Sequence, residues 1–430
     1  MTLMSMIIAN VRLVLPERLA PGSVLVKGGT IAAVAEGAPG DGFPPAWKEA
    51  GKAAGAAVEI IDGGGLYLSP GFIDLHNHGR LGRDAMETFN ISLDGGVPQS
   101  GGTAAGSGEA NEPLETIARG QAEHGVTSFL AGTSTIPWEY VPAAVRRIAA
   151  FCRESAAGPP EGGKPAARCL GIYSEGSFFS REKRGAHNPR WLKEAISEAD
   201  LEVLMDAAGE TLKVLALSPE LPGALPAIRA LVGRGVTVSA AHSNAVYAEA
   251  QAGIDAGITL STHTFNGMRA LSHQEPGILG AVLNDPRVCC ELIADGIHLA
   301  PPVLSLVHKI KGSGGVVLVS DSVAPNGLPD GRYEGEGRTV LVRDGTIRLE
   351  DGRLAGSSLS LDGAVRNMIR LGGASVPGAV RMASLNPARI LGVEDRAGSV
   401  AAGKDADLVL FDETISVRAV FIGGKRFQFR

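Results

Sequence analysis

The sequence predicts an α/β protein, namely a (β/α)8 TIM-like barrel with a small β-sandwich domain built from both ends of the chain. Three observations lead to this prediction. The chain has 430 residues, more than one small core usually holds. Short apolar runs alternate with amphipathic stretches over about 250 residues, the length typical of such a barrel. The first and last segments instead resemble short strands joined by glycine-containing turns.

The apolar runs are the predicted barrel strands. Near-continuous apolar strands suit a parallel sheet that is covered on both faces. Between them, stretches such as LETIARGQAEHG and ALPAIRALVGRG have the periodicity of amphipathic helices. The predicted strands are Gly71–Leu75, Val126–Leu130, Cys169–Ser174, Lys213–Leu217, Val236–Ala241, Ile258–Thr262, Val288–Ile293 and Val316–Ser320.

The two chain ends predict the second domain. MIIANVRLVLP and GSVLVKGGTIAAVAEG near the start, and GSVAAGKDADLVLFDETISVRAVFIGGKRF near the end, both have the pattern of strands and turns. Residues 38–57 are rich in Gly, Pro and Ala and predict a surface insertion. We therefore assign residues 1–68 and 386–430 to the small β domain and residues 69–385 to the barrel.

Composition and charge exclude several function classes. The net charge of −6 argues against nucleic acid as a partner, which would require a basic face. No apolar run approaches the ~20 residues of a membrane span, and the start has no basic region typical of a signal peptide. The four cysteines form no CxxC pair and are expected to be reduced thiols. We therefore expect a cytoplasmic protein with neither a nucleic-acid nor a membrane partner.

A long Gly/Ser-rich run, LDGGVPQSGGTAAGSGEANEP, follows the first predicted barrel strand. Its composition is typical of a disordered surface loop. Loops after barrel strands also line the active-site face, so residues 95–112 could instead form a lid. Both interpretations stay open at this point.

Polar residues suited to metal binding and acid–base chemistry follow five of the predicted strands. Four of the nine histidines in the chain lie at these positions. Taken singly, each histidine could be a hydrogen-bonded core residue, and each carboxylate could cap a helix. Because active-site residues of such barrels gather at the strand ends, six of them at one rim favour a metal site. The residues are His76 and His78 after the first strand, Glu175 after the third, His242 after the fifth, His263 after the sixth and Asp321 after the eighth.

This residue set indicates metal-assisted hydrolysis. Imidazoles with carboxylates suit zinc or another divalent transition metal, not calcium. Such a metal lowers the pKa of a bound water towards ~7. Asp321 could take the proton of the attacking water and pass it to the leaving group. His187 and His298, in two nearby loops, could donate to an oxyanion or to the substrate, or could simply bond to backbone.

Several motifs together resemble the N-acetylglucosamine-6-phosphate deacetylase family of the amidohydrolase superfamily. They occur in family order between about residue 60 and about residue 412. The motifs are PGFIDLHNHG, SEGSFF, KRGAHNP, SAAHSNA, THTFNGM, EPGILGAVLND, IADGIHLAP, LVSDSVAP, AGSSLSLDGAVRNM, NPARILG and GSVAAGKDADLVLFD.

The resemblance implies a role for each residue and one or two divalent ions per subunit, with zinc as the first choice and iron, manganese or cobalt as alternatives. It also implies a homodimer. Asp321 would be the general base and acid, and His187 would polarise the acetamide carbonyl. The implied metal ligands are Glu175, His242 and His263 for the main ion and His76 and His78 for a second ion. The implied substrate-binding set is Asn266, the backbone around Gly267, and His298.

The sequence departs from the family where an arginine is expected to contact the sugar phosphate. The usual REPG is QEPG here, so Gln274 occupies that position. A neutral amide cannot form the bidentate, charge-assisted pair that a guanidinium forms with phosphate. Ser177 also stands where proline is common. Arg269, or a basic residue within 181–184, could compensate.

We therefore predict an amide hydrolase that removes acetyl from an N-acetyl amino sugar, with N-acetylglucosamine 6-phosphate as the first candidate substrate. Gln274 motivates one alternative, a related amidohydrolase that acts on an unphosphorylated or differently modified N-acyl sugar. The remaining alternative is a non-catalytic scaffold on the same fold, although such a protein would typically have lost metal ligands.

Overall fold

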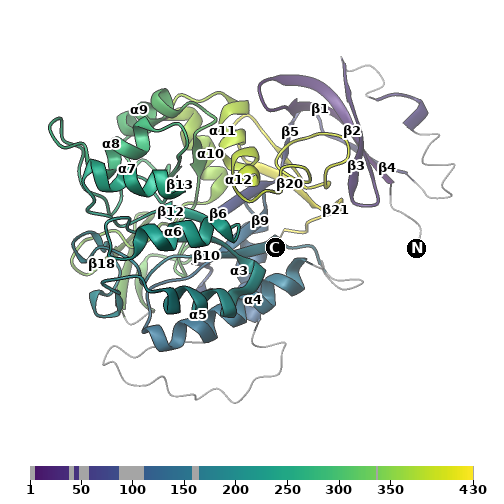
Figure 1. Ribbon diagram of the computed structural model, residues 1–430. Helices are drawn as coiled ribbons and strands as arrows, with labels where there is room; N and C mark the ends of the chain where they lie inside the picture. Colours follow the sequence, from purple (N-terminus) through teal and green to yellow (C-terminus); the bar gives the residue numbers. More distant parts are fainter. Residues whose placement is uncertain are drawn as a thin grey trace.

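A curled sheet of parallel strands forms the centre of the larger domain (Figure 1). The computed structural model describes residues 5–37, 43–47, 58–86, 111–156, 164–335 and 338–429. The strand order is β15-β14-β13-β12-β11-β10-β9-β6, so every strand pairs with its neighbour in this series. The strands are β6 (Phe72–Asn77), β9 (Val126–Gly132), β10 (Arg168–Ser174), β11 (Leu212–Leu217), β12 (Thr237–Ala240), β13 (Ile258–Ser261), β14 (Cys289–Leu292) and β15 (Val316–Leu318). All eight predicted barrel strands are confirmed, with small shifts at their ends.

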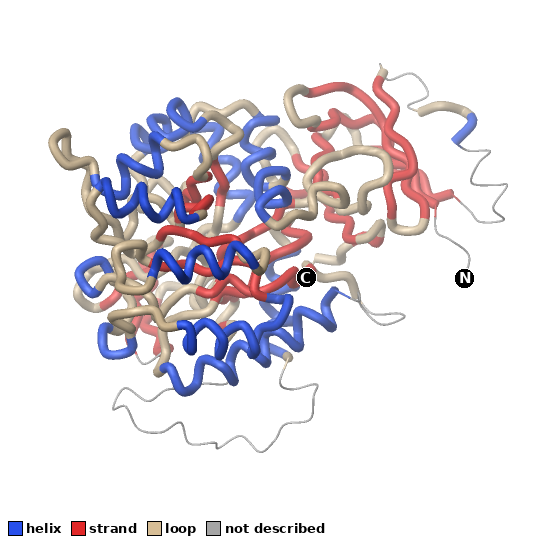
Figure 2. The backbone as a smooth tube through the Cα atoms, viewed as in Figure 1, coloured by secondary structure: helices blue, strands red, loops and turns tan. Residues whose placement is uncertain are grey.

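A helix follows each of these strands and covers the sheet from outside, as the blue helices around the red strands show in Figure 2. None of the described helices is long and apolar enough to cross a membrane. The helices are α3 (Glu112–Ala122), α4 (Val141–Ala156), α5 (Glu198–Ala208), α6 (Ala224–Gly233), α7 (Tyr247–Ala256), α8 (Gly277–Asn284), α9 (Pro301–Lys311) and α10 (Leu361–Arg370). Two further helices, α11 (Val376–Ala383) and α12 (Leu385–Ile390), follow α10.

The first and last strands meet and close the barrel. Asn77, at the end of β6, forms a parallel bridge with Ser322, just beyond β15. The amide of Asp321 donates to the carbonyl of His76 at 2.9 Å, and the amide of His78 donates to the carbonyl of Ser322 at 2.8 Å. Closure therefore brings the end of the first strand and the end of the last strand side by side.

Both faces of the barrel sheet are buried, as the apolar strands predicted. Alternate residues of a strand point to opposite faces, so each strand supplies two cores. Ile73 and Leu75 of β6 pack inside the barrel with Leu130, Val214 and Val317. The outward residues pack against the helices, and they include Phe72, Phe129, Leu215 and the buried thiols Cys169 and Cys290; the buried thiol of Cys152, on α4, lies in the same core.

The small domain consists of one eight-stranded sheet from both ends of the chain, which confirms that both ends build a separate β domain. Its order is β21-β20-β19-β5-β1-β2-β3, with β4 also paired to β1. A register shift between Ile8 and Val11, where Asn10 has φ of 54°, lets β1 pair with β4 at its start and β5 at its end. The strands are β1 (Ser5–Val14), β2 (Leu19–Lys27), β3 (Thr30–Glu36), β4 (Val58–Asp62), β5 (Tyr67–Pro70), β19 (Leu408–Phe411), β20 (Val417–Ile422) and β21 (Lys425–Arg426).

A separate three-stranded antiparallel sheet lies between β15 and α10 in the chain, and the sequence analysis did not predict it. Its strands are β16 (Gly331–Gly335), β17 (Arg338–Arg343) and β18 (Thr346–Leu349). Val340, Val342 and Ile347 form a small core against Ala186 and Val323, which lie beside the barrel strand ends. This sheet therefore covers part of the rim on which the predicted site lies.

Two predictions about the chain's organisation remain predictions. The proposed lid at residues 95–112 falls mostly within 87–110, which lies outside the described residues. The domain boundaries near 68 and 385 also remain an assignment from sequence. In the structure, β5 continues to Pro70, and Asn386 of α12 donates at 2.7 Å to the barrel carbonyls of Ser313 and Val316.

An ion pair joins the two domains and generates a stability prediction. Arg168, at the start of β10, donates to the buried carboxylate of Asp407, which also accepts from the amide of Gly423 at 2.8 Å. Arg168→Ala would leave that carboxylate buried without its counter-ion and lower the apparent free energy of unfolding by about 3 kcal/mol, measurable by urea denaturation.

The matched control is Arg396→Ala. Arg396 bonds Asp405 at 2.9 Å, but its side chain is 75% exposed, so its loss should cost less than about 1 kcal/mol. If the two variants lowered the free energy of unfolding equally, the prediction that the buried Arg168–Asp407 pair contributes more than an exposed pair would be wrong.

Candidate metal centre and active site

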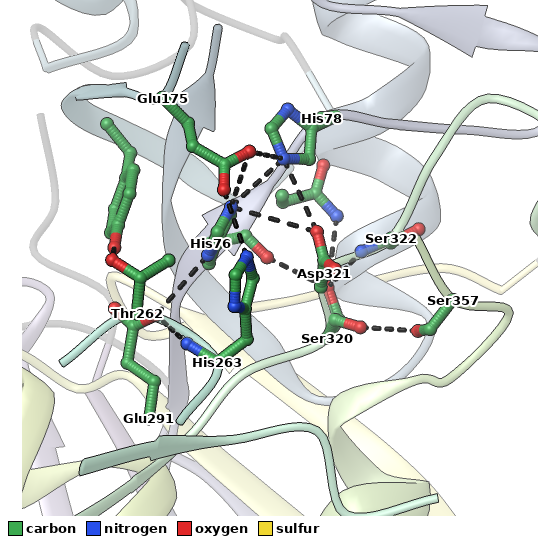
Figure 3. Close-up of polar contacts among 12 residues, drawn as sticks. His76, His78, Glu175, Thr262, His263, Glu291, Ser320, Asp321, Ser322 and Ser357 are labelled. Atoms are coloured by element: carbon green, nitrogen blue, oxygen red, sulfur yellow. Dashed lines mark hydrogen bonds and ion pairs between the residues drawn. The ribbon is translucent and has the colours of Figure 1, made fainter. Parts of the chain in front are cut away.

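The six polar residues predicted at the strand ends come together at one end of the barrel, and all six are buried. His76 and His78 face each other across 2.9 Å between their Nε2 atoms. Figure 3 shows Glu175 beside both rings, and the carboxylates of Glu175 and Asp321 both contact Nε2 of His78. Two groups of possible ligand atoms each lie within 4.8 Å of one another: His76, His78 and Asp321 in one, and Glu175, His242 and His263 in the other.

Glu175 lies between the two pairs of histidines and directs one oxygen at each pair. Its Oε1 is 3.3 Å from Nε2 of His242 and 3.1 Å from Nε2 of His263. Its Oε2 is 3.5 Å from Nε2 of His76 and 3.2 Å from Nε2 of His78. Each oxygen of Glu175 therefore faces one pair of histidines.

Strained backbone holds three of these residues. His242, His263 and Asp321 have φ of 43°, 27° and 46°, in the left-handed region that non-glycine residues rarely occupy. Each such residue costs of order 1–3 kcal/mol and persists only where its surroundings fix it. Each follows the end of a barrel strand, so the strain redirects the chain and places the side chain over the barrel opening.

The histidines are oriented by partners behind them. Nδ1 of His242 lies 2.8 Å from the carbonyl of Lys183, which can only accept, so Nδ1 donates to it and the ring is held with Nε2 towards Glu175. Nδ1 of His76 lies 3.3 Å from the buried carboxylate of Glu291. Partners of this kind fix the ring orientation and raise the basicity of a metal ligand.

Charge in this pocket is balanced between carboxylates and imidazoles. Burial opposes ionisation of His78, but hydrogen bonds with Asp321 and Glu175 outweigh it and raise its pKa to about 10. The pKa of His76 is likewise raised well above its usual value, against the effect of burial, mainly by the charge of Glu175. Burial raises the pKa of Glu175, yet the charge of His76 and the surrounding imidazoles bring it well below the usual range. Without metal, protons therefore supply the positive charge that the carboxylates require.

The donor set fits a divalent transition metal. Imidazole nitrogens and carboxylate oxygens converge in a buried space, and Nδ1 of His78 and Nδ1 of His263 have no hydrogen-bond partner among the described residues. Calcium and magnesium would instead be expected to have mostly oxygen ligands. The site therefore combines two adjacent ligand groups with a shared carboxylate.

His187 lies beside the centre as a neutral imidazole. Its Nδ1 is 2.7 Å from the hydroxyl of Thr135, and its Nε2 is 3.7 Å from Glu175. Burial lowers the pKa of His187 well below its usual value. In the tautomer in which the Thr135 hydroxyl donates to Nδ1, the ring proton is on Nε2, from which it can be donated into the cavity.

A cavity of about 250 Å³ opens onto the centre and includes most of the predicted substrate-binding residues. Asn266, Gly267 and His298 line it together with Asp321 and His187. Nδ1 of His298 bonds the carboxylate of Asp295 at 2.7 Å, which orients that ring. A Cβ on Gly267 would lie 2.4 Å from Nδ1 of His242, so only glycine allows this close approach.

Gln274 is a predicted substrate-binding residue that the structure does not bring to this cavity. It lies in an exposed turn before α8 and is not among the described residues that line the cavity. Arg269, named as a compensating residue, also lies outside the lining and donates from Nε to the carbonyl of Asn244 at 2.8 Å.

Sequence reasoning missed three residues of the site. Glu291 lies within the apolar stretch VCCELIA, and a carboxylate inside a buried strand is itself a signal of a partner. Arg338 and Arg353 line the cavity from the three-stranded sheet and the turn after it. The Asp344–Gly345 pair between two β-rich runs is a hairpin signal that could have revealed this sheet.

Comparison with known proteins is consistent with this geometry. The family model described as "Amidohydrolase family" matches residues 67–427. The chain belongs to the amidohydrolase family. This family is metal-dependent and hydrolytic, so the chain is a metal-dependent hydrolase.

Individual relatives within the amidohydrolase family are similar over most of their length. An N-acetylgalactosamine-6-phosphate deacetylase of Escherichia coli O157:H7 is 38% identical over 372 residues, covering 86% of this chain and 90% of that protein. An N-acetylglucosamine-6-phosphate deacetylase of Vibrio furnissii is 34% identical over 379 residues, covering 86% and 87%. The resemblance to N-acetylglucosamine-6-phosphate deacetylases stated from the motifs is confirmed.

A solved structure of a deacetylase confirms the fold. The N-acetyl-D-glucosamine-6-phosphate deacetylase of Mycobacterium smegmatis, in complex with N-acetyl-D-glucosamine-6-phosphate, aligns with a TM-score of 0.81 at 28% identity over 99% of both chains. The barrel with its small β domain is thus an architecture that this amidohydrolase shares with solved deacetylases.

Protons and metal compete for the same histidines, which predicts that metal affinity depends on pH. His76 and His78 have raised pKa values in the metal-free site, so at neutral pH the pair holds at least one proton more than two neutral rings would. A metal binds neutral imidazole, so binding must release protons, and affinity should rise as pH rises. Calorimetric titration of metal-free protein with Zn²⁺ in buffers of different ionisation enthalpy should give heats that depend on the buffer. Equal heats in all buffers, with affinity independent of pH, would contradict this charge balance.

Proposed function

We propose that this protein is a metal-dependent deacetylase that converts N-acetylglucosamine 6-phosphate to glucosamine 6-phosphate and acetate. One observation carries the proposal: Glu175, four histidines and Asp321 converge in a buried site on a chain related over most of its length to deacetylases of N-acetyl amino sugar phosphates. The intact set argues against a non-catalytic scaffold, which would be expected to lack ligands.

Asp321 is the group that moves the proton in the proposed reaction. Burial opposes its ionisation, but the hydrogen bond from His78 and the nearby imidazole charges lower its pKa to about 2, so it is a carboxylate at neutral pH. It accepts one proton from the water that attacks the acetamide carbon. It then delivers this proton to the sugar nitrogen as the C–N bond breaks, which gives the free amine and acetate.

His187 stabilises charge on the acetamide oxygen. Its neutral ring can donate from Nε2 while the Thr135 hydroxyl holds Nδ1. A donor fixed in this way stabilises an oxyanion without reorganisation during the reaction. When bound, the metal supplies an acidified water and polarises the carbonyl. Asn266, Gly267 and His298 are the groups proposed to bind the sugar.

We further propose zinc as the metal, with two ions per chain. Glu175, His242 and His263 would hold one ion, and His76 and His78 would hold the second beside Asp321, with Glu175 between the ions. The support for two ions is the division of the Glu175 oxygens between the two histidine pairs. A homodimer and a cytoplasmic location remain predictions from sequence.

The proposal of a second ion can be tested by measuring how much metal a variant binds. In the double variant His76→Asn/His78→Asn, bound metal should fall by one ion per chain, as measured by plasma mass spectrometry on protein purified with zinc. His273→Asn is the matched control because His273 is exposed and lies outside both ligand groups. A double variant with the metal content of the wild type would show that the two histidines hold no ion of their own.

The reaction can be tested by release of acetate. The wild type, loaded with zinc, should deacetylate N-acetylglucosamine 6-phosphate, and Asp321→Asn should lower kcat by about 10²–10⁴-fold, because the amide cannot accept the proton. Metal content is measured in parallel, so that loss of metal is not mistaken for loss of the base. Full activity of a metal-loaded Asp321→Asn protein would refute the mechanism.

The same acetate-release assay distinguishes between the candidate substrates. The E. coli relative at 38% identity is named for the galactosamine epimer, and Gln274 motivates an unphosphorylated sugar. Comparing kcat/KM for N-acetylglucosamine 6-phosphate, N-acetylgalactosamine 6-phosphate and free N-acetylglucosamine distinguishes these candidates. A higher value for either of the last two would replace the proposed substrate but keep the deacetylase chemistry.

A further inference from the structure

Glu291 is a buried carboxylate inside the barrel, and the chemistry proposed above does not use it. It lies on β14, where its neighbours Cys290 and Leu292 pack outward against the helices. Because side chains of a strand alternate between its two faces, Glu291 points into the barrel interior. No lysine or arginine pairs with it among the residues that the structure describes. A buried carboxylate is costly without partners, so the partners of Glu291 indicate its role.

The hydrogen-bond partners of this carboxylate are two proposed metal ligands (Figure 3). Its Oε2 lies 3.3 Å from Nδ1 of His76 and accepts from the backbone amide of His263 at 3.2 Å. Its Oε1 has no hydrogen-bond partner among the described residues. The other nitrogen of His76, Nε2, faces Nε2 of His78 at 2.9 Å. Glu291 therefore contacts the His76 ring behind the metal centre and is not itself placed as a ligand.

The contact with His76 determines how that ring meets a metal. A neutral imidazole that donates from Nδ1 to a carboxylate presents the lone pair of its Nε2 to the metal. Tyr173 stacks on the same ring, with centroids 4.3 Å apart and an interplanar angle of 15°. Tyr173 thus holds the face of the His76 ring, and Glu291 holds its edge.

The contact with His263 reaches the other ligand group, but only through the backbone. His263 has φ of 27°, and its amide bond to Glu291 helps to hold this strained turn. The ring of His263 is oriented separately, because its Nε2 lies 3.1 Å from Oε1 of Glu175. Loss of the Glu291 side chain would therefore free the ring of His76 and leave the ring of His263 with its own partner.

We propose that Glu291 is a positioning residue for the second ion and holds His76 so that Nε2 is the ligand atom. This inference rests on the two-ion centre proposed above and extends it to a residue outside both ligand groups. Removing a hydrogen-bond partner of this kind typically lowers metal affinity about 10–100-fold. The second ion should therefore depend on Glu291 more strongly than the main ion does.

The test is a titration of metal-free protein with Zn²⁺ in competition with a chelating dye. Glu291→Leu should lower the affinity for the second ion about 10–100-fold, because both contacts are lost. Glu291→Gln should lower this affinity by a smaller factor, since the amide oxygen can still accept both contacts but without the charge. If Glu291→Leu does not fold, as judged by circular dichroism, the comparison of Glu291→Gln with the wild type decides.

The matched control is Ser239→Ala, which also removes a buried polar group from the barrel interior. The hydroxyl of Ser239 lies 2.6 Å from that of Thr262 rather than against a ligand histidine, so this variant should leave both zinc affinities unchanged.

A second background identifies which ion is affected. In His76→Asn/His78→Asn protein only the main ion remains, so adding Glu291→Leu should change its affinity by less than Glu291→Leu changes the second affinity in the wild type. An equal loss for the two ions would show that Glu291 supports the fold as a whole, and the inference would be overturned.

The zinc titration needs no catalysis, which separates this inference from the proposed function. If the wild type binds two ions but releases no acetate, the proposed function fails, and the titration still decides on Glu291. If the Glu291 variants bind the second ion as tightly as the wild type, or the wild type binds only one ion, the inference is overturned. The acetate-release assay then still decides on the deacetylase chemistry.

Discussion

The buried charge of Glu175 is the constraint on which the rest of the site depends. A carboxylate removed from water is stable only beside compensating charge and hydrogen-bond donors. His76 and His78 meet one of its oxygens, and His242 and His263 meet the other. These four residues come from three strand ends of the barrel, so the compensation exists only when the barrel is closed. Folding and site assembly are therefore one event.

The surrounding structure holds the histidines and Asp321 in their positions around Glu175. The left-handed turns at His242, His263 and Asp321 aim the side chains over the barrel opening, and glycine at 267 lets the next turn pass directly against the His242 ring. Behind the rim, Tyr173 stacks on His76 with ring centroids 4.3 Å apart, and Glu291 fixes the far nitrogen of the same ring. Side chains held in this way suit a preorganised centre.

Sequence patterns were sufficient to predict the barrel and the polar residues at its strand ends, because both follow from the order of apolar and polar residues along the chain. Apolar runs mark the strands, parallel order brings their carboxyl ends together, and Glu175 and Asp321 were recognised as residues that follow a strand. The three-stranded sheet was missed, although the Asp344–Gly345 turn signalled it, because its half-polar strands do not resemble a barrel unit. Whether Gln274 faces the active-site cavity of the same chain depends on how an exposed turn packs. No local sequence pattern determines this packing.

The small domain has a consequence for how the chain folds as it is synthesised. β5 pairs on one side with β1 and on the other with β19, which lies beyond the whole barrel in the chain. Until residues 408–411 emerge from the ribosome, one edge of β5 presents unpaired backbone groups, the kind of edge that promotes association with other chains. The strands of this domain that precede the barrel must therefore wait, partly unprotected, until the strands that follow the barrel have been synthesised.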